Sequence, residues 1–534
     1  MDQSAIKLYL GEEAFTLLEN EDFQQEWDNL YKGCSKATMF QSQAFVSNWY
    51  WVYQKKYLPI IVTEVRDGRL VGLLTLAKKG RIIRSAGADL AEYCVWLTEA
   101  HNQESFIQTA LTVVKKRFPR APIYFKYIPE TVPLNWIKES RWKNYCVLKS
   151  FKQPLLKLDT NNPQKHRKRK YETNRMKRLG DMVLERIIDY DTFATILEEM
   201  IVLHDFRKGA LYNKALFQQD PNRKAFLLEL FKQNLLHVVV LKLNGNIVSA
   251  GIAMIENKRI YFKGLICHSP SYSKYSPGIV SLQLTIELLA KEGFEEIDVS
   301  PGDESYKNEL CTHFGVVYVL SIGSIYNRIS SNINDRLTKH FKKLTGNLAA
   351  KRGISYTQLK KFKLQVMLLS DKLENIKKQK PTTLIKALLT KAVVRKKVKK
   401  FISQLESPLL SYVHFEHIRK NCIKDLMAFK SEGTLLSQWQ FLQRSMRRLE
   451  AGQTVYTWCE KDQLMGCVFL NHHKTRDSEA WQLDGFYFHP DSQSQIQAFL
   501  LAVVNEVRKE QMSNQLFAIA TSTDKKLHKH LEKA

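Results

Sequence analysis

Residues 237–307 of this 534-residue chain read HVVVLKLNGNIVSAGIAMIENKRIYFKGLICHSPSYSKYSPGIVSLQLTIELLAKEGFEEIDVSPGDESYK. This stretch decides the fold, because short apolar runs separated by turn residues give way to one longer helical pattern. The apolar runs predict three strands, at 235–243, 247–255 and 259–267. The pair Asn244-Gly245 separates the first two, and it favours the positive φ angles of a tight hairpin turn.

A helix is predicted directly after these strands. Its start is the SPG sequence at 276–278, where Ser can cap, Pro is tolerated at the first helical position, and the backbone N–H groups form an anion site. The helix ends near Gly293, and a fourth strand follows at 296–299. An acidic turn, PGDE at 301–304, comes next. The stretch therefore predicts an α/β unit with a place for a phosphate-bearing ligand.

The same order of elements recurs along the chain. A helix, a hairpin, and then strand, helix and strand are predicted within residues 1–158, again at 193–300, and a third time at 406–534. We therefore predict an α/β (α+β) fold of repeated mixed-sheet units. The predicted domains are 1–158, 159–330, a basic helical hairpin or linker at 331–405, and 406–534.

The net charge of +27 is concentrated in two segments. Residues 331–400 hold 20 Lys and Arg against three acids, and residues 161–180 hold eight against one, so the rest of the chain is nearly neutral. Such segments fit an anionic partner: tRNA, another nucleic acid or an anionic membrane surface. The alternative is a solvated helical spacer at 331–400 and a solvated bridging helix at 161–180.

The cysteines and the apolar segments exclude several classes of protein. The eight cysteines are scattered without the spacing of metal ligands, which predicts reduced thiols and no metal. The N-terminus lacks the pattern of a signal peptide, and no apolar run approaches the roughly 20 residues that span a bilayer. We therefore expect a cytoplasmic protein. The oligomeric state is left open.

Three pieces of sequence resemble the GNAT superfamily of acetyltransferases, in particular its cellulose-biosynthesis-type branch. FQS at 40–42 with Trp49 and Trp51 is similar to the opening of that branch, and LHDFRKG at 203–209 is similar to its H-x-x-R segment. Residues 272–307 are the closest match, and the resemblance covers about residues 1–325. It implies two GNAT-like units in tandem, with the site in the second. The architecture is also similar to Fem-type aminoacyl transferases, which use charged tRNA.

This resemblance implies direct transfer of an acyl group from a thioester. A general base takes a proton from the attacking amine or hydroxyl, and a donor stabilises the departing thiolate. The implied catalytic candidates are Asp303, Glu304 and His204 as bases, Tyr306 (or Tyr272 or Tyr275) as proton donor, and Lys307 for a phosphate or the oxyanion. The implied cofactor-binding residues are Tyr272, Lys274, Tyr275, Ser276, Pro277 and Gly278. Each also has a structural interpretation: His204 as a core histidine, Asp303 and Glu304 as caps, and Lys307 as a surface ion.

The loops depart from the usual glycine-rich pattern of the superfamily. The central loop holds only Gly278, and the corresponding loop at 491–495 (DSQSQ) has no glycine and one acid, which disfavours a pyrophosphate. The C-terminal unit is therefore predicted to be a degenerate GNAT-like domain used for substrate selection or dimerisation.

The leading prediction is a bacterial-type acyltransferase that uses acetyl-CoA or another acyl-CoA. Its acceptor would be a sugar amine, a polysaccharide or cell-envelope precursor, or a small amine. The alternatives are a Fem-like transferase that draws on aminoacyl-tRNA, and a non-catalytic GNAT scaffold that binds nucleic acid or membrane through 331–400.

Overall fold

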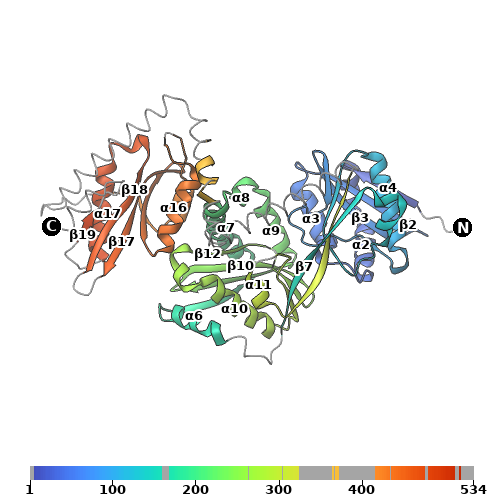
Figure 1. Ribbon diagram of the computed structural model, residues 1–534, viewed down its shortest axis with the longest axis horizontal. Helices are drawn as coiled ribbons and strands as arrows, with labels where there is room; N and C mark the ends of the chain where they lie inside the picture. The colour runs from blue at the N-terminus through green and yellow to red at the C-terminus, as the bar shows by residue number, and fades with distance from the viewer. Residues whose placement is uncertain are drawn as a thin grey trace, which may run out of the picture.

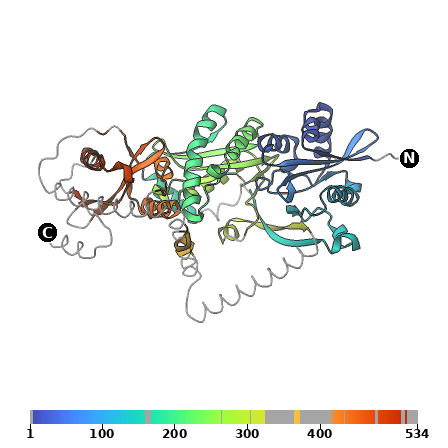
Figure 2. The same ribbon diagram turned by 90° about the horizontal axis from the view of Figure 1, so that it is seen from above.

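Three α/β units lie in a row in the computed structural model, with the N-terminus at one end (Figures 1 and 2). The structure describes residues 5–158, 167–262, 264–302, 305–323, 364–365, 367–371, 374, 415, 417–432, 434–474, 479–510 and 516–518. The predicted helical hairpin at 331–405 lies almost wholly outside these residues. Among the described helices, none is long and apolar enough to cross a membrane.

The first unit is built from residues 5–157. Its main elements are β1 (Ala5–Leu10), α1 (Glu12–Glu19), α2 (Glu21–Gly33), α3 (Gln43–Tyr53), β2 (Leu58–Arg66), β3 (Arg69–Lys79), β4 (Ile82–Ser85), β5 (Leu97–Thr98), α4 (Gln103–Arg117), β6 (Ile123–Pro129) and β7 (Cys146–Lys157). The predicted hairpin is confirmed: β2 and β3 are antiparallel, and Asp67 and Gly68 have positive φ between them.

The second unit, residues 167–322, contains the strands and the helix predicted within residues 237–307. Its elements are α6 (Arg167–Lys177), β8 (Met182–Ile187), α7 (Tyr190–Tyr212), α8 (Leu216–Gln219), α9 (Asn222–Lys232), β9 (Leu236–Leu243), β10 (Asn246–Glu256), β11 (Arg259–Tyr261), β12 (Ile266–His268), the 3-10 helix η5 (Pro270–Tyr275), α10 (Pro277–Lys291), β13 (Glu296–Asp298), α11 (Ser305–Leu310) and β14 (His313–Ile322). Figure 1 shows α7, α8 and α9 on one face of its sheet and α6 and α10 on the other.

The prediction of one strand over 259–267 is wrong. The structure has two short strands there, β11 and β12, and both pair with β10. Between them the chain bends so closely over β10 that Gly264 lies against the backbone of Ile252, and the Ile252 N–H donates to the Leu265 carbonyl at 2.7 Å. Only a residue without a side chain fits this approach.

The first two units share one sheet because they exchange their last strands. The order of the sheet is β1-β2-β3-β4-β6-β14-β7-β13-β11-β10-β9-β8. β7 of the first unit pairs with β13 of the second, and β14 of the second unit pairs with β6 of the first. β7 and β14 also pair with each other from Leu155↔His313 to Cys146↔Ile322. Figure 1 shows β7 running from the second unit into the first.

The third unit, residues 418–518, repeats the same order of elements around a separate sheet, β15-β16-β17-β18-β19. Its elements are β15 (Ile418–Lys420), α15 (Ile423–Met427), α16 (Gln438–Glu450), β16 (Thr454–Glu460), β17 (Gln463–Lys474), β18 (Glu479–Phe488), α17 (Ile496–Glu510) and β19 (Leu516–Ala518). The hairpin β16–β17 and the parallel pair β18–β19 match the predicted topology.

Replacing Gly264 tests whether the break between β11 and β12 is fixed by close packing. In Gly264→Ala the new methyl carbon would overlap the Ile252 carbonyl oxygen and lie 3.0 Å from its carbonyl carbon. We expect this backbone clash to lower the stability of the protein by about 1–3 kcal/mol, measured as the change in the denaturation midpoint. The control is Gly33→Ala, where nothing lies within 4 Å of the added atom. Equal stability of the two variants would contradict the packing argument.

Candidate active site

The sheet of the second unit opens where β11 and β13 diverge. These strands pair in parallel only from Arg259↔Glu296 to Tyr261↔Asp298. Beyond Tyr261 the chain continues as β12 along β10, and no pairing joins β12 to β13 in the described residues. The opening thus lies at the carboxyl ends of two parallel strands, the usual place for ligands in α/β sheets.

A cavity of about 470 Å³ occupies this opening, a size suited to a small organic ligand. Its walls come from α7, from β9, β10 and β12, and from the first turns of α10. The lining is mainly apolar: Phe262, Ile266, Ile279, Leu282 and Val299 all contribute. Polar side chains sit at the α7 wall, so the site combines an apolar channel with a few directed groups.

The structure places some of the predicted residues at the cavity, others beside the start of α10, and leaves a few undescribed. His204 and Gly278 line the cavity. Tyr272, Lys274 and Tyr275 lie in η5, and Ser276 and Pro277 form the start of α10 beside it. Asp303 and Glu304 lie outside the described residues, and only the backbone of Tyr306 is described, as part of α11.

Lys307 supports the turn after β13. Its side chain is buried, and its Nζ donates to the Ser300 carbonyl oxygen at 2.8 Å. Ser300 has a positive φ of 61°, a backbone conformation that needs such support in a residue other than glycine. The structure therefore gives this lysine a contact with the backbone beside the opening.

His204 is buried on α7 and is oriented by its neighbour. Its Nδ1 lies 3.1 Å from Asp205 Oδ1, and Asp205 accepts hydrogen bonds from the backbone N–H groups of Phe217 (3.0 Å) and Gln218 (2.9 Å). A neutral imidazole that donates its Nδ1–H to this carboxylate would keep the lone pair on Nε2. A carboxylate that fixes the tautomer of a histidine is the arrangement of an oriented general base.

Arg207 and His268 form a pair that the sequence analysis did not assign. Arg207 lies one turn of α7 beyond His204, and its Nη1 is 2.6 Å from His268 Nε2. Burial and the neighbouring guanidinium lower the pKa of His268 to about 4, so its ring is neutral at pH 7. Arg207 belongs to the LHDFRKG segment that resembles the family. His268 belongs to no motif, and only its place at the end of a strand distinguishes it in the sequence.

Asp298 is a second functional candidate that was missed. It is fully buried at the end of β13, where it accepts hydrogen bonds from Tyr93 Oη (2.6 Å), Gln153 Nε2 (2.7 Å) and the Ser300 N–H (2.8 Å). Burial, the largest cause, raises the pKa of Asp298 to about 6 despite these donors. Since Tyr93 and Gln153 belong to the first unit, this carboxyl group links the two units at the edge of the opening.

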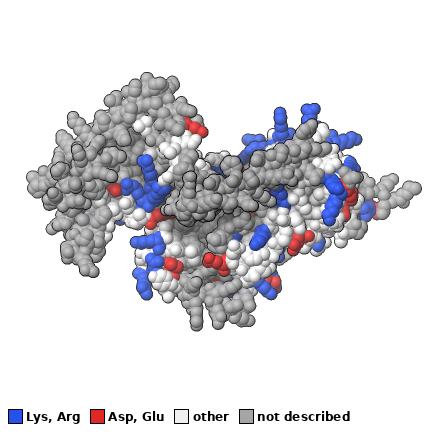
Figure 3. Space-filling view, in the orientation of Figure 1, with Lys and Arg blue, Asp and Glu red and all other residues white. Residues whose placement is uncertain are grey.

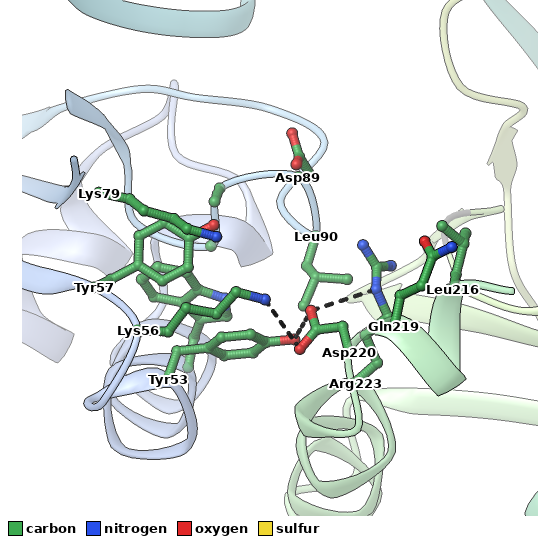
Figure 4. Close-up of a pocket in the computed structure, with 13 residues that line it drawn as sticks. Tyr53, Lys56, Tyr57, Lys79, Asp89, Leu90, Leu216, Gln219, Asp220 and Arg223 are labelled. Atoms are coloured by element: carbon green, nitrogen blue, oxygen red, sulfur yellow. Dashed lines mark hydrogen bonds and ion pairs between the residues drawn. The ribbon is translucent and has the colours of Figure 1, made fainter. Parts of the chain in front are cut away.

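A smaller cavity of about 210 Å³ lies between the first unit and helices α8 and α9 of the second (Figure 4). Asp220 is its central acid: it accepts from Tyr53 Oη at 3.1 Å and lies 3.2 Å from Lys56 Nζ and 3.6 Å from Arg223 Nε. Lys79 adds a cation over the ring of Tyr57, at 5.5 Å from its centroid. Asp89 is the other acid in the lining. Three cations and several aromatic rings around these two acids suit a small anionic group attached to a ring.

The basic helix α6 lies beside the start of α10. It packs against α10 and η5. The guanidinium of Arg175 is 5.3 Å from the ring centroid of Tyr275 and forms an ion pair with Glu172 at 3.2 Å. The basic segment at 161–180 is therefore joined, through α6, to the predicted phosphate end of the site.

No metal site is found in the part of the chain that the structure covers. No group of three or more His, Cys, Asp or Glu side chains there could hold an ion.

The raised pKa of Asp298 predicts how stability depends on pH. A carboxyl group whose pKa rises from 3.8 to about 6 on folding binds its proton more tightly in the folded state, so stability falls as pH increases through this window. Two pKa units correspond to a loss of about 3 kcal/mol above pH 6.

Asp298→Asn removes this titration. The quantity to compare is the melting temperature of the wild type minus that of the variant at the same pH. We expect this difference to be smaller, or more negative, at pH 7.5 than at pH 4. Asp191→Asn, at an exposed carboxylate, serves as the control. A difference between wild type and Asp298→Asn that does not change with pH would refute the assignment.

Comparison with known proteins connects this geometry to a family. Residues 164–308 match a family model described as an acetyltransferase (GNAT) domain. The search of curated proteins gives no significant match.

Several solved structures align with more than half of this chain. FemX has 11% identity and a TM-score of 0.39, covering 56% of this chain and 95% of its own. A tandem GNAT protein from the clavulanic acid biosynthesis pathway has 10% identity and a TM-score of 0.38, covering 60% and 99%. A C-terminal domain assigned to a lysylphosphatidylglycerol synthetase from Agrobacterium fabrum has 12% identity and a TM-score of 0.41, covering 59% and 95%. The family match thus covers nearly the whole of the second unit of this chain.

Proposed function

We propose that this chain transfers an acyl group from acyl-CoA to an amine or hydroxyl acceptor. The observation that carries the proposal is the 470 Å³ cavity in the opening between β12 and β13, bounded by the start of α10 and lying within the GNAT match. The cellulose-biosynthesis-type branch remains our prediction for its place within the superfamily.

The two ends of the cavity suit the two ends of an acyl-CoA. The apolar walls around Ile266 and Leu282 accommodate the uncharged pantetheine arm. At the other end, α10 begins at Ser276, whose side chain makes no cap hydrogen bond, and Lys274 and Arg175 lie nearby. A helix start with cations beside it favours phosphate groups.

His204 is the base candidate whose surroundings support the proposed chemistry. With its proton on Nδ1 held by Asp205, its Nε2 would take the proton from the attacking acceptor as the new bond to the thioester carbonyl forms. The tetrahedral intermediate then expels the thiolate, which takes a proton from Tyr272, Tyr275 or Tyr306. Asp303 and Glu304 remain alternative bases, and we assign Lys307 to holding the turn at Ser300.

The smaller cavity between the units is our candidate for part of the acceptor site. Its rings, Trp49, Tyr53 and Tyr57, suit the face of a sugar, and Lys56, Lys79 and Arg223 suit a phosphate or carboxylate. This favours an anionic sugar derivative, consistent with polysaccharide or cell-envelope metabolism.

A Fem-like donor, aminoacyl-tRNA, is the second candidate. It is favoured by the basic segment at 161–180, part of which forms α6 against the start of α10. Strongly salt-dependent tRNA binding, lost when the cations at 165–178 are neutralised, would support it over acyl-CoA.

Binding of coenzyme A tests the donor site directly. Ile266 lines the cavity and is 56% exposed, so Ile266→Asp places a negative charge on the apolar wall without disturbing the core. We expect at least a tenfold loss of CoA affinity by calorimetry, since an unpaired charge disfavours both the apolar arm and the phosphates. Ile188→Asp, at a position that is 80% exposed and outside the cavity lining, should bind like the wild type. Wild-type protein that binds no CoA at millimolar concentration would refute the donor assignment.

Turnover tests the general base. His204→Gln should lower kcat by about 10²–10⁴-fold with little change in CoA affinity, because the proton acceptor is lost. The assay is thiol release from acetyl-CoA with a panel of amino sugars and sugar phosphates. Asp303→Asn and Glu304→Gln are measured alongside it, and His472→Gln, at an exposed site of the third unit, is the control. Unchanged kcat in His204→Gln would assign His204 to structure and leave the base to one of the two carboxylates.

A further inference from the structure

The third unit is anchored to the helix that forms one wall of the cavity. Trp439 Nε1 on α16 donates to the Ala210 carbonyl on α7 at 3.0 Å. Leu442 and Leu449 of α16 belong to one apolar core with Phe206 and Ala210 of α7. α7 therefore packs on the sheet of its own unit along one face and against the third unit near its C-terminal end.

The same helix reaches the start of α10. α16 packs against η5, the 3-10 helix that leads into Ser276. Gly452, just after α16, faces Lys274, because a Cβ atom placed on this glycine would lie 3.9 Å from Lys274 Nζ. Near the middle of α16, Leu442 packs closely against α7, because a Cβ atom placed on Gly209 would lie 3.1 Å from Leu442 Cδ1. α16 thus lies beside both the polar wall of the cavity and its phosphate end.

α16 carries a stripe of arginines. Arg444, Arg447 and Arg448 are spaced by three and four residues, which places them on one side of the helix. Arg448 pairs with Asp484. Within the described residues neither Arg444 nor Arg447 forms an ion pair, and both are exposed.

The charges around this stripe do not balance. The side chain of Arg444 is exposed overall, but partial desolvation by the surrounding protein, together with the neighbouring Arg448 and Arg447, lowers its pKa. Glu450 is the acid at the end of the helix, and both Arg207 of the cavity wall and Arg447 lower its pKa, although burial raises it more. On the face shown in Figure 3, Lys and Arg gather over α16, where the third unit meets the second.

The start of α10 offers few free backbone N–H groups to a phosphate. Pro277 has no N–H, and the N–H groups of Ile279 and Val280 both donate to the Ser276 carbonyl, at 2.9 and 3.1 Å. Fewer amides are therefore free than in a glycine-rich loop, whose bare N–H groups cradle phosphates. Exposed arginines on α16, the helix that packs against η5, would offset that loss.

We propose that Arg444 and Arg447 of the third unit, together with Lys274 of the second, bind the phosphate groups of the acyl-CoA donor. The third unit thereby completes the donor site of the second unit, in place of a site of its own. This inference rests on the proposed function, and it assigns a role to a unit whose own loop, with Asp491 and no glycine, disfavours a pyrophosphate.

The test compares ligands that differ in their phosphates on the full chain. Calorimetry with coenzyme A, dephospho-coenzyme A and pantetheine is carried out on wild type and on Arg444→Met/Arg447→Met. Both arginines are exposed, so the double variant should fold, and its melting temperature checks this. We expect at least about a tenfold loss of CoA affinity, as for lost charge-assisted hydrogen bonds, with pantetheine affinity unchanged.

Arg508→Met, an exposed arginine on α17 of the same unit, controls for loss of general positive charge and should bind CoA like the wild type. CoA binding that is unchanged in the double variant, or that falls equally for pantetheine, would overturn the inference and leave the proposed function standing. Failure of the wild type to bind CoA would overturn both, so the two failures are distinguishable.

Discussion

The pairing of β7 with β14 is the constraint on which both cavities depend. Each strand belongs by sequence to one unit and by hydrogen bonding to the other, so the two units are halves of one sheet. β7 also pairs with β13, and this places Gln153 against Asp298 at the edge of the opening. The smaller cavity, between α3 and the α8–α9 segment, lies across the same junction. Separating the units would remove the partners of a buried carboxyl group, which is costly.

Local pattern predicted the second unit well, because its elements are set by short-range chemistry. The hairpin turn at Asn244-Gly245 has φ of 50° and 79°, as an Asn-Gly pair favours. The helix beginning at Pro277 also follows from a local signal. The break between β11 and β12 could not be predicted in this way, since it depends on Gly264 meeting the backbone of a neighbouring strand.

The site was predicted only in part, for a related reason. Gly278 and His204 stood in segments with a family resemblance, and both line the cavity. Asp298 was overlooked because its partner Tyr93 is 205 residues away, and no pattern in one sequence reports such a contact. The pairing of β7 was likewise hidden, since that strand mixes exposed polar residues with a proline. Both the contacts of Asp298 and the position of β7 depend on pairing between strands far apart in the sequence, which local sequence patterns do not report.

Charge and packing together explain why a third unit can matter to the second. Its apolar contact with α7 fixes α16 in one orientation, so the backbone that carries the arginines would need little ordering if an anion bound there. Cations on a flexible segment would bind an anion less favourably, because binding would also cost the conformational entropy of their backbone and side chains. A repeated unit whose own loop has no glycine could therefore contribute charge to its neighbour, because its helix is buried on one side and exposed on the other.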